Sequence, residues 1–456
     1  MSGCEQMKTE LDWSNYHDQG MGDAYADIPK NGGNYAKAIS VCIRSNRCQL
    51  HDNRGVMCPS FRITNDEALS PGGRVALLKA LLNQNDYSFL HDPQLEDTLN
   101  SCVSCKGCKR ECENNIDMAA IKAEYLAQQK QSGKKSLRSW LFGHFPDLML
   151  QYPQLAYLIR LRNKSSIVRM LSRFVLKMNS HIELPEPACK PFSSSLTNAY
   201  PTEEVEKNVV LLVDNFTAIF HPHIAHSTEV LLNAAGYQVT TIAPTDTNSG
   251  RPLDTGRSLF SQGYISEARK HAVELIEALW PYVEKGHRII GLEPSSALMI
   301  RDEFLMMGLG EKAQQLANAT LLLEEFIARE TKAGRFTLNF RPWEKKHNVL
   351  VHGHCHQKAV GAMKSMRKAL RLIPDLPFEF IEASCCGMAG SFGLEAEHAK
   401  ESRDMAQLGL LPALDADSTA TVVCNGFSCG HQILALTGRK PLHIATLLYD
   451  MLETAN

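Results

Sequence analysis

Four cysteines within eleven residues constrain this chain more than any other feature of its sequence. Cys102, Cys105, Cys108 and Cys112 follow the spacing C-x2-C-x2-C-x3-C. Three thiolates at three-residue intervals can surround one face of a [4Fe–4S] cluster, while the fourth reaches a neighbouring cluster. Structural zinc usually takes two separated pairs of ligands, so this compact run favours an iron–sulfur cluster over zinc.

An earlier cysteine run supplies the partner that a two-cluster domain needs. Cys42 and Cys48 flank Ser45, which stands where a middle cysteine would be, and Cys58 is followed by Pro59. The pattern therefore predicts crosswise ligation of two clusters. The complete ligand set is Cys58, Cys102, Cys105 and Cys108, and the incomplete set is Cys42, Cys48 and Cys112.

The fourth ligand of the incomplete set stays open. The oxygen of Ser45, Asn46, a hydroxide and no ligand at all are alternatives, and the last would leave a [3Fe–4S] cluster. A second cluster that is absent or labile is the remaining alternative.

A second cysteine group lies near the C-terminus, at Cys355, the pair Cys385-Cys386 and Cys429. Each follows a β-rich segment, and the carboxyl ends of parallel strands converge on one edge where ligands bind. Adjacent cysteines do not form an unstrained disulfide with each other, so we predict a metal or redox centre. Its occupant stays open between a non-cubane cluster, a cubane cluster and zinc, with buried cysteines that line a packed edge as the plain alternative.

Other residues near these cysteines receive simpler interpretations. The neighbouring histidines are expected to form hydrogen bonds rather than to bind metal, and Cys424 has no clear place in the group. Cys4 and Cys189 are expected to be free thiols. The histidines concerned are His352, His354, His356 and His431.

Composition narrows the class of protein further. Of the 14 cysteines, 12 fall in the two groups, and these groups are expected to serve metal or redox chemistry. A reducing cytoplasm is expected, because the polar N-terminus has no secretory signal. The formal net charge of −2 indicates no nucleic-acid partner. The sequence has no run of about 18 apolar residues, so no transmembrane helix is predicted.

The chain divides into segments of different character. A loosely ordered polar arm is expected over 1–40, a helical ferredoxin-type domain over 41–130, and a basic helical connector with a linker over 131–206. Helical periodicity is clear at 74–83 and 118–129, with Asp117 as the N-cap of the second helix. Two α/β halves are expected to follow, at 207–340 and 341–456.

The connector alternates basic and apolar residues over 134–182 and predicts amphipathic helices. One alternative is helices packed on a neighbouring domain with a solvated basic face. The other is a docking surface for a partner protein or for an anionic membrane, which would place the protein at the inner face of that membrane. The basic residues are Lys134, Lys135, Arg138, Arg160, Arg162, Lys164, Arg169, Arg173 and Lys177, against a single Asp147.

The two α/β halves are copies of one unit. Leu212–Thr217 aligns with Leu350–Cys355, and Ile289–Ser296 aligns with Val422–Cys429. In the first copy the cysteines are replaced by Thr217, Asn248, Ser249 and Ser296. Because hydroxyls and amides bind iron poorly, we expect a degenerate, metal-free first half. The predicted fold class is α plus α/β, with a helical two-cluster ferredoxin domain before a duplicated α/β domain.

The ordered motifs resemble a known family from about residue 40 to the end of the chain. The spacing of Cys355, Cys385-Cys386-Gly387 and Cys429 is similar to the cysteine-rich CCG domain of heterodisulfide reductase. That domain also occurs in the iron–sulfur subunits of glycolate oxidase and anaerobic glycerol-3-phosphate dehydrogenase. The motifs Gly55–Arg74, Cys102–Cys112, Gly291–Ser295, His354–Ala359, Cys385–Gly393 and Asn425–Cys429 resemble the iron–sulfur half of FAD-linked D-2-hydroxyacid dehydrogenases of the D-lactate and D-2-hydroxyglutarate type.

The resemblance implies a non-catalytic electron-transfer subunit. Its partner would be a separate FAD-binding dehydrogenase subunit, and its acceptor a quinone or a cytochrome. Lys106, Lys109 and Arg110 are expected to favour the reduced, more negative state of the clusters. Glu113 replaces the usual proline after Cys112, and the loss of the first CCG element puts a metal centre in the first half in doubt.

Two other functions stay open at this point. One is a heterodisulfide-reductase-like subunit that acts on disulfides at the CCG centre. The other is a zinc-holding assembly or redox-sensing subunit, for which Ser45 and the lost cysteines would be signs of decay.

Overall fold

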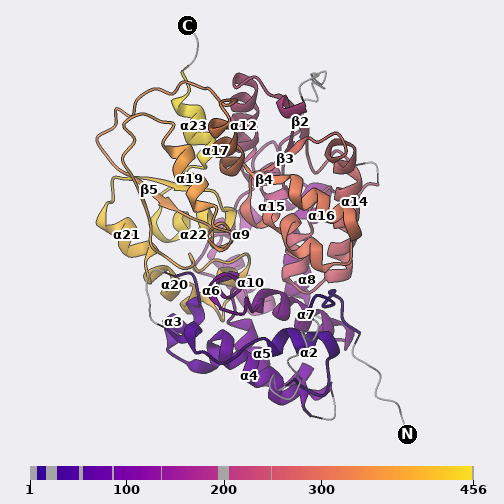
Figure 1. The fold of residues 1–456 in the computed structure, drawn as a ribbon. Helices are drawn as coiled ribbons and strands as arrows, with labels where there is room; N and C mark the ends of the chain where they lie inside the picture. The colour runs from indigo at the N-terminus through magenta and orange to yellow at the C-terminus, as the bar shows by residue number, and fades with distance from the viewer. Residues whose placement is uncertain are drawn as a thin grey trace.

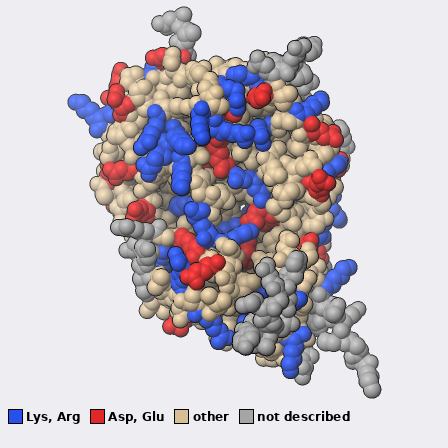
Figure 2. All heavy atoms as spheres, in the orientation of Figure 1, with Lys and Arg blue, Asp and Glu red and all other residues tan. Residues whose placement is uncertain are grey.

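The computed structural model describes residues 8–16, 28–50, 55–84, 87–134, 136–193, 205–247 and 249–453. A helical N-terminal part lies beneath two α/β halves that stand side by side (Figure 1). No helix among these described residues is both long enough and apolar enough to cross a bilayer. Acidic and basic side chains are interspersed on the face in Figure 2, where Lys and Arg gather over the upper left.

The helical part is built around α4 (Pro71–Leu82) and α7 (Met118–Gln131), which confirms the two helices predicted from periodicity. Asp117 caps α7 by accepting a hydrogen bond from the Ala120 N–H at 3.1 Å. Short helices complete this part and carry the cysteine loops between them. They are α2 (Gly33–Ser40), α3 (Pro59–Thr64), α5 (Pro93–Asn100) and α6 (Gly107–Glu111).

The arm over 1–40 was expected to be loosely ordered, but those of its residues that the structure describes pack against the helical part. Leu11 and Trp13 are buried in its core. Glu124 of α7 holds this segment by accepting hydrogen bonds from Leu11 N–H and Trp13 Nε1–H, at 2.8 and 3.2 Å. Two apolar side chains in a polar segment were too weak a signal to predict this packing.

Each α/β half contains a parallel sheet with its first strand in the interior. The first sheet has the order β2-β1-β3-β4 and the second has the order β6-β5-β7, so the repeat is visible in the topology. The strands are β1 (Asn208–Leu212), β2 (Gln238–Ile242), β3 (Arg288–Gly291), β4 (Thr320–Leu322), β5 (Val349–His352), β6 (Phe378–Phe380) and β7 (Thr421–Cys424). The parallel strands expected of the two α/β halves are confirmed.

The two halves share one hydrophobic core. Val209 and Ile290 of the first sheet belong to the same buried cluster as Val351 and Val423 of the second. Matching helices close this core, because α12 (Pro222–Ala234) packs on α23 (Ile444–Met451) and α17 (Leu323–Lys332) packs on α19 (Met363–Leu370). The first half therefore supports the second whether or not it binds metal.

The connector forms three helices with different environments. Helix α8 (Leu137–Gln151) packs on α11 (Asn215–Phe220) and α13 (Arg257–Ser261), and Met149 is buried beside Phe220. Helix α9 (Leu155–Lys164) buries only part of its surface, and α10 (Ser166–Leu176) buries no residue at all. Helix α8 thus packs on a neighbouring domain, whereas α10 leaves its face open.

A buried ion-pair network joins the helical part to the first α/β half. Lys106 Nζ lies 2.6 Å from Asp302, 3.1 Å from Glu303 and 3.6 Å from Asp117. Burial alone would lower the pKa of Lys106, but these carboxylates raise it well above its usual value. Lys106 is therefore a buried charge that all three carboxylates share, while Lys109 and Arg257 lie at the edges of the network.

We predict that Lys106→Met destabilises the protein by up to about 3–5 kcal/mol, because it removes the most deeply buried cation of the network and leaves Lys109 and Arg257 to neutralise the three carboxylates only in part. Anaerobic guanidinium unfolding would measure the change. Lys312→Met is the matched control, since Lys312 forms an exposed pair with Glu277 at 2.9 Å and its loss should cost about 1 kcal/mol or less. Equal stability of the two variants would contradict a structural role for the network.

Candidate iron–sulfur and CCG centres

The structure brings Cys58 together with Cys102, Cys105 and Cys108. All four line one pocket between α3, α6 and α7, although Cys58 is distant from the others in sequence. Cys58 stands immediately before Pro59 at the start of α3, and Cys108 lies within α6. This is the grouping that crosswise ligation predicts for the complete set.

The remaining three cysteines of the first group line a second pocket. Cys42, Cys48 and Cys112 share it with Ser45 and Asn46, two of the alternatives for a fourth ligand. Cys48 lies close enough to Cys58 for the two thiols to influence each other electrostatically, and Met57 lines both pockets. The two predicted ligand sets are therefore neighbours.

The two cysteine loops have the same unusual backbone. Ser104 and Lys106 have φ of 50° and 59°, and Arg44 and Asn46, at the same positions of the earlier loop, have φ of 55° and 56°. Alternation of left- and right-handed residues turns successive N–H groups inward and forms a concavity for anions. Ser45 stands at the position that Cys105 occupies in the later loop. The backbone of its loop nevertheless keeps the same conformation.

Arg74 is a buried cation beside the complete set. Its side chain is fully buried, with Nη1 donating to Cys58 Sγ at 3.7 Å and Nε donating to the Thr98 carbonyl at 2.6 Å. Its Nη2 has no hydrogen-bond partner. Burial alone would lower the pKa of Arg74, but Cys102 and Cys58 raise it. A buried guanidinium with thiols as neighbours fits a negatively charged thiolate cluster.

The cations expected to tune the clusters are engaged elsewhere. Lys109 Nζ pairs with Asp302 at 2.5 Å and with Asp117 at 3.0 Å, in the network that also contains Lys106. Arg110 donates to the Ala359 carbonyl of the second half. Sequence reasoning missed Arg74, and the available signal was a charged residue on the apolar face of the predicted helix 74–83.

The second cysteine group also comes together, at the carboxyl ends of β5, β6 and β7. Cys355 begins α18 (Cys355–Ala359), Cys385 and Cys386 follow β6, and Cys429 lies in α22 (Phe427–Thr437). The thiols contact one another in the order Cys355, Cys385, Cys386, Cys429 and Cys424. Cys424, which had no clear place from the sequence, thus lies beside Cys429.

The pKa values of four of these thiols are raised, namely those of Cys355, Cys385, Cys386 and Cys429. A hydrogen bond with Cys385 and burial raise the pKa of Cys355 well above its usual value. For Cys385 the bond with Cys355 lowers the pKa, whereas a bond with Cys386 and burial raise it, to about 12. Five buried thiols in contact match the donor chemistry of iron–sulfur and zinc sites, whose ions would replace these protons.

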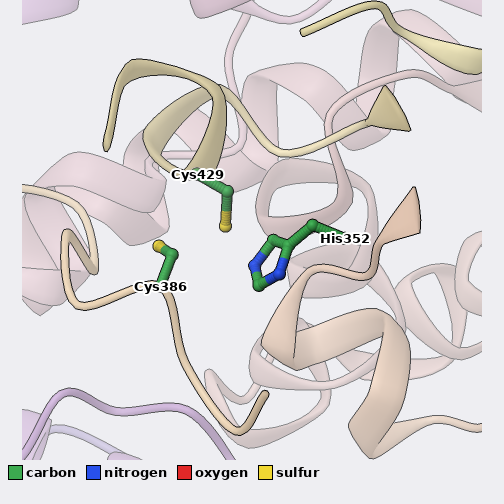
Figure 3. A group of neighbouring side chains, drawn as sticks. All are labelled: His352, Cys386 and Cys429. Atoms are coloured by element: carbon green, nitrogen blue, oxygen red, sulfur yellow. The ribbon is translucent and has the colours of Figure 1, made fainter. Parts of the chain in front are cut away.

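The three histidines before and after Cys355 have different roles. His354 caps α18 by accepting the His356 N–H at Nδ1, and His356 Nε2 bonds to the Ser104 carbonyl of the ferredoxin loop at 3.0 Å. His352 has no hydrogen-bond partner, and its imidazole faces Cys386 and Cys429 (Figure 3). One donor atom each of His352, Cys386 and Cys429 lies within 4.8 Å of the other two.

The complete set of the ferredoxin domain reaches the second group directly. Cys105 shares a small buried cluster with Cys355 and Cys385. Burial and then Cys355 raise the pKa of Cys105 well above its usual value. Two sites that are about 250 residues apart in the chain are therefore sulfur neighbours in space.

The first α/β half shows what the lost cysteines became. Thr217 donates to Asp214 Oδ2 at 2.7 Å, and Ser249 donates to Glu274 at the surface. Ser296 is buried with an unpaired hydroxyl. Burial and the nearby Glu293 raise the pKa of Asp214 to about 7. Asn248 lies outside the described residues. The described positions form a capped, oxygen-rich counterpart without a thiol.

This fold and these sites define an iron–sulfur protein whose architecture suits electron transfer. Residues 38–116 match the family model of the 4Fe-4S dicluster domain. The chain is 23% identical to D-2-hydroxyglutarate dehydrogenase of Pseudomonas putida over 88% of its own length and 42% of that protein. It is therefore similar to a part of that enzyme and spans about two fifths of it.

Two further relatives are separate subunits that match over most of their length. One belongs to the anaerobic glycerol-3-phosphate dehydrogenase of Escherichia coli and is 24% identical, over 70% of this chain and 78% of its own. The other is the glycolate oxidase iron–sulfur subunit of the same organism, which is 20% identical over 87% of this chain and 91% of its own. No solved structure matches. The resemblance noted from the motifs is thereby confirmed.

The glycine of the Cys-Cys-Gly motif has a geometric reason that yields a prediction. Gly387 has φ of 90°, and a Cβ there would collide with the Ser402 carbonyl. We expect Gly387→Ala to displace the Cys385-Cys386 loop and to lower metal content at this centre by more than half. Gly390→Ala is the control, because Gly390 also has positive φ but nothing lies near its Cβ, so about 1 kcal/mol of strain is expected. Metal analysis and unfolding of both variants test this, and full metal content in Gly387→Ala would contradict it.

Proposed function

We propose that this chain is the electron-transfer component of an FAD-dependent 2-hydroxyacid dehydrogenase. Electrons would come from a separate flavoprotein and leave to a quinone or another acceptor. The observation that supports this function best is that Cys105 lies in one small buried cluster with Cys355 and Cys385. A relay needs neighbouring redox sites, and this cluster brings cysteines of two such sites together across the domain boundary.

The proposed ligands follow from the two pockets and the thiol chain. Cys58, Cys102, Cys105 and Cys108 would hold one [4Fe–4S] cluster, and Cys42, Cys48 and Cys112 would hold a second with a further ligand from solvent or the loop. Cys355, Cys385, Cys386 and Cys429 would hold the terminal centre. When bound, such clusters accept and release single electrons.

The order of the sets in space gives the relay a direction. The Cys42 loop is exposed, as are the apolar side chains of Ile43 and Leu50 beside it, whereas the complete set and the CCG centre are buried. Cys48 neighbours Cys58, and Cys105 neighbours Cys355. We infer that the flavoprotein docks at the exposed loop.

This chain's own residues would set the environment of the relay. Arg74 supplies a fixed positive charge at Cys58, and Lys122 Nζ donates to the carbonyl of Cys102 at 2.6 Å. Both cations stabilise a more negative state of the complete set. His356, through its bond to Ser104, holds the ferredoxin loop against the second half.

We further infer that the protein works in the cytoplasm at the surface of an anionic membrane, and that α10 makes the contact. Ile167 is 79% exposed and Phe174 is 77% exposed, and three more apolar side chains of α10 are also exposed. No acidic residue occurs between Asp147 and Glu183, while six basic residues do. An exposed apolar face beside basic side chains is complementary to anionic lipid.

The relay is tested by cofactor content and cysteine substitution. Anaerobically purified protein is expected to contain about eight or more irons per chain, with interacting reduced-cluster signals in EPR. Cys105→Ala should lose about four irons and most electron transfer from a reduced donor to a quinone analogue, whereas Cys189→Ala, at an exposed isolated thiol, should change neither. Full iron and full transfer in Cys105→Ala would contradict the ligand assignment, and zinc with about four irons or fewer would contradict the relay.

The membrane contact is tested by vesicle co-sedimentation. Wild type is expected to bind vesicles of phosphatidylglycerol and to bind less tightly as salt rises, because salt screens the basic residues. Ile167→Glu combined with Phe174→Glu should weaken binding at least tenfold. Val273→Glu is the control, since Val273 is a partly exposed apolar residue of α14 (Ile265–Val283). Equal binding by the double variant would refute a role for α10.

A further inference from the structure

We propose that the imidazole of His352 is itself a ligand of the CCG centre, so that this centre has one nitrogen donor beside its thiolates. The inference rests on the proposed function, because it requires a metal at the centre. It assigns a role that the pattern of cysteines alone does not reveal.

The first observation is the isolation of the ring. His352 is 1% exposed, and neither Nδ1 nor Nε2 has a hydrogen-bond partner. A neutral imidazole carries one N–H donor and one lone pair, and burial of both without partners is costly. A metal ion would take the lone pair. The surroundings of the ring therefore favour an occupant at this position over plain packing.

The second observation is where the ring points. In Figure 3 the imidazole lies across from the thiols of Cys386 and Cys429. The three donors come from three elements, the end of β5, the loop after β6 and helix α22, and their donor atoms lie within 4.8 Å of one another. Thiolate and imidazole together suit zinc and iron, so the donor set is chemically consistent.

The neighbouring buried histidines show that an unpaired ring is unusual here. His443 uses both nitrogens, as Nδ1 accepts the Ala445 N–H at 3.0 Å and Nε2 bonds to the Leu292 carbonyl at 3.3 Å. His354 and His356 each have a partner as well. Among these four rings, His352 is the one without a hydrogen-bond partner on either nitrogen, and one of its nitrogens lies within 4.8 Å of two thiols.

The repeat gives an internal comparison. Asp214 occupies the position of His352 in the first half and caps α11 by accepting the Thr217 N–H at 3.0 Å. In the second half the cap of α18 is His354, two residues later. His352 is therefore relieved of the capping role that its counterpart performs, and from the end of β5 its ring faces Cys386 and Cys429.

The test uses full-length protein labelled with ¹⁵N-histidine and a set of variants. Loss of metal in Cys386→Ala first identifies which metal the centre carries. Pulsed EPR then measures nitrogen hyperfine coupling if the centre is paramagnetic, and X-ray absorption at the zinc edge measures imidazole scattering if it is zinc. His352→Cys is the conservative variant, because it offers a thiolate in place of the imidazole. His443→Asn is the control, since asparagine can keep the helix cap.

We expect an imidazole signal with ¹⁵N character in labelled wild type and in His443→Asn. We expect no such signal in His352→Cys, although that variant keeps its metal, and His352→Ala should lose metal to a chelator at least tenfold faster. A metal-loaded wild type without imidazole coupling would overturn the assignment of His352 but leave the centre intact. If wild type holds no metal that depends on Cys386, the terminal centre of the proposed function fails too.

Discussion

The constraint on which this structure depends is the burial of cysteine thiols from two domains in one small cluster. Cys105 of the ferredoxin loop lies in this cluster with Cys355 and Cys385 of the second α/β half, and all three side chains are buried. Bare thiolates could not be buried in this way because their mutual repulsion and desolvation would be too costly. The arrangement becomes stable when the thiols are neutral or when metal ions neutralise them, and the raised pKa values of these thiols express that constraint.

Around the sulfurs the chain places its cations in two different roles. Arg74 and Lys122 approach the complete set from within the helical part, whereas Lys106 and Lys109 are neutralised by carboxylates at the domain interface. The first pair can influence redox potential, and the second pair holds the domains in register. Position in the fold, rather than closeness in sequence to a cysteine, decides which task a cation performs.

This distinction shows how far the sequence alone could lead. The parallel α/β architecture and the repeat were predictable, because buried parallel strands are near-continuous apolar runs and the motifs recur at matching places. The grouping of Cys58 with Cys102 was predicted by the crosswise rule. The packing of Trp13 and the partner of Lys106 depend on contacts across more than 100 residues, and the isolation of His352 depends on side chains from several elements, which no local pattern encodes.

The first α/β half has a structural role that does not need cysteines. Its strands complete a core that also contains β5 and β7, so its removal would expose the support of the second half. Its strand ends also face those of the second half, where Phe216 stacks on Phe427, two residues before Cys429. Because Phe145 of α8 belongs to the same aromatic cluster, the connector, the degenerate half and the terminal centre form one continuous packed unit. The membrane contact proposed for α10 would thus hold the CCG centre at a fixed height above the lipid.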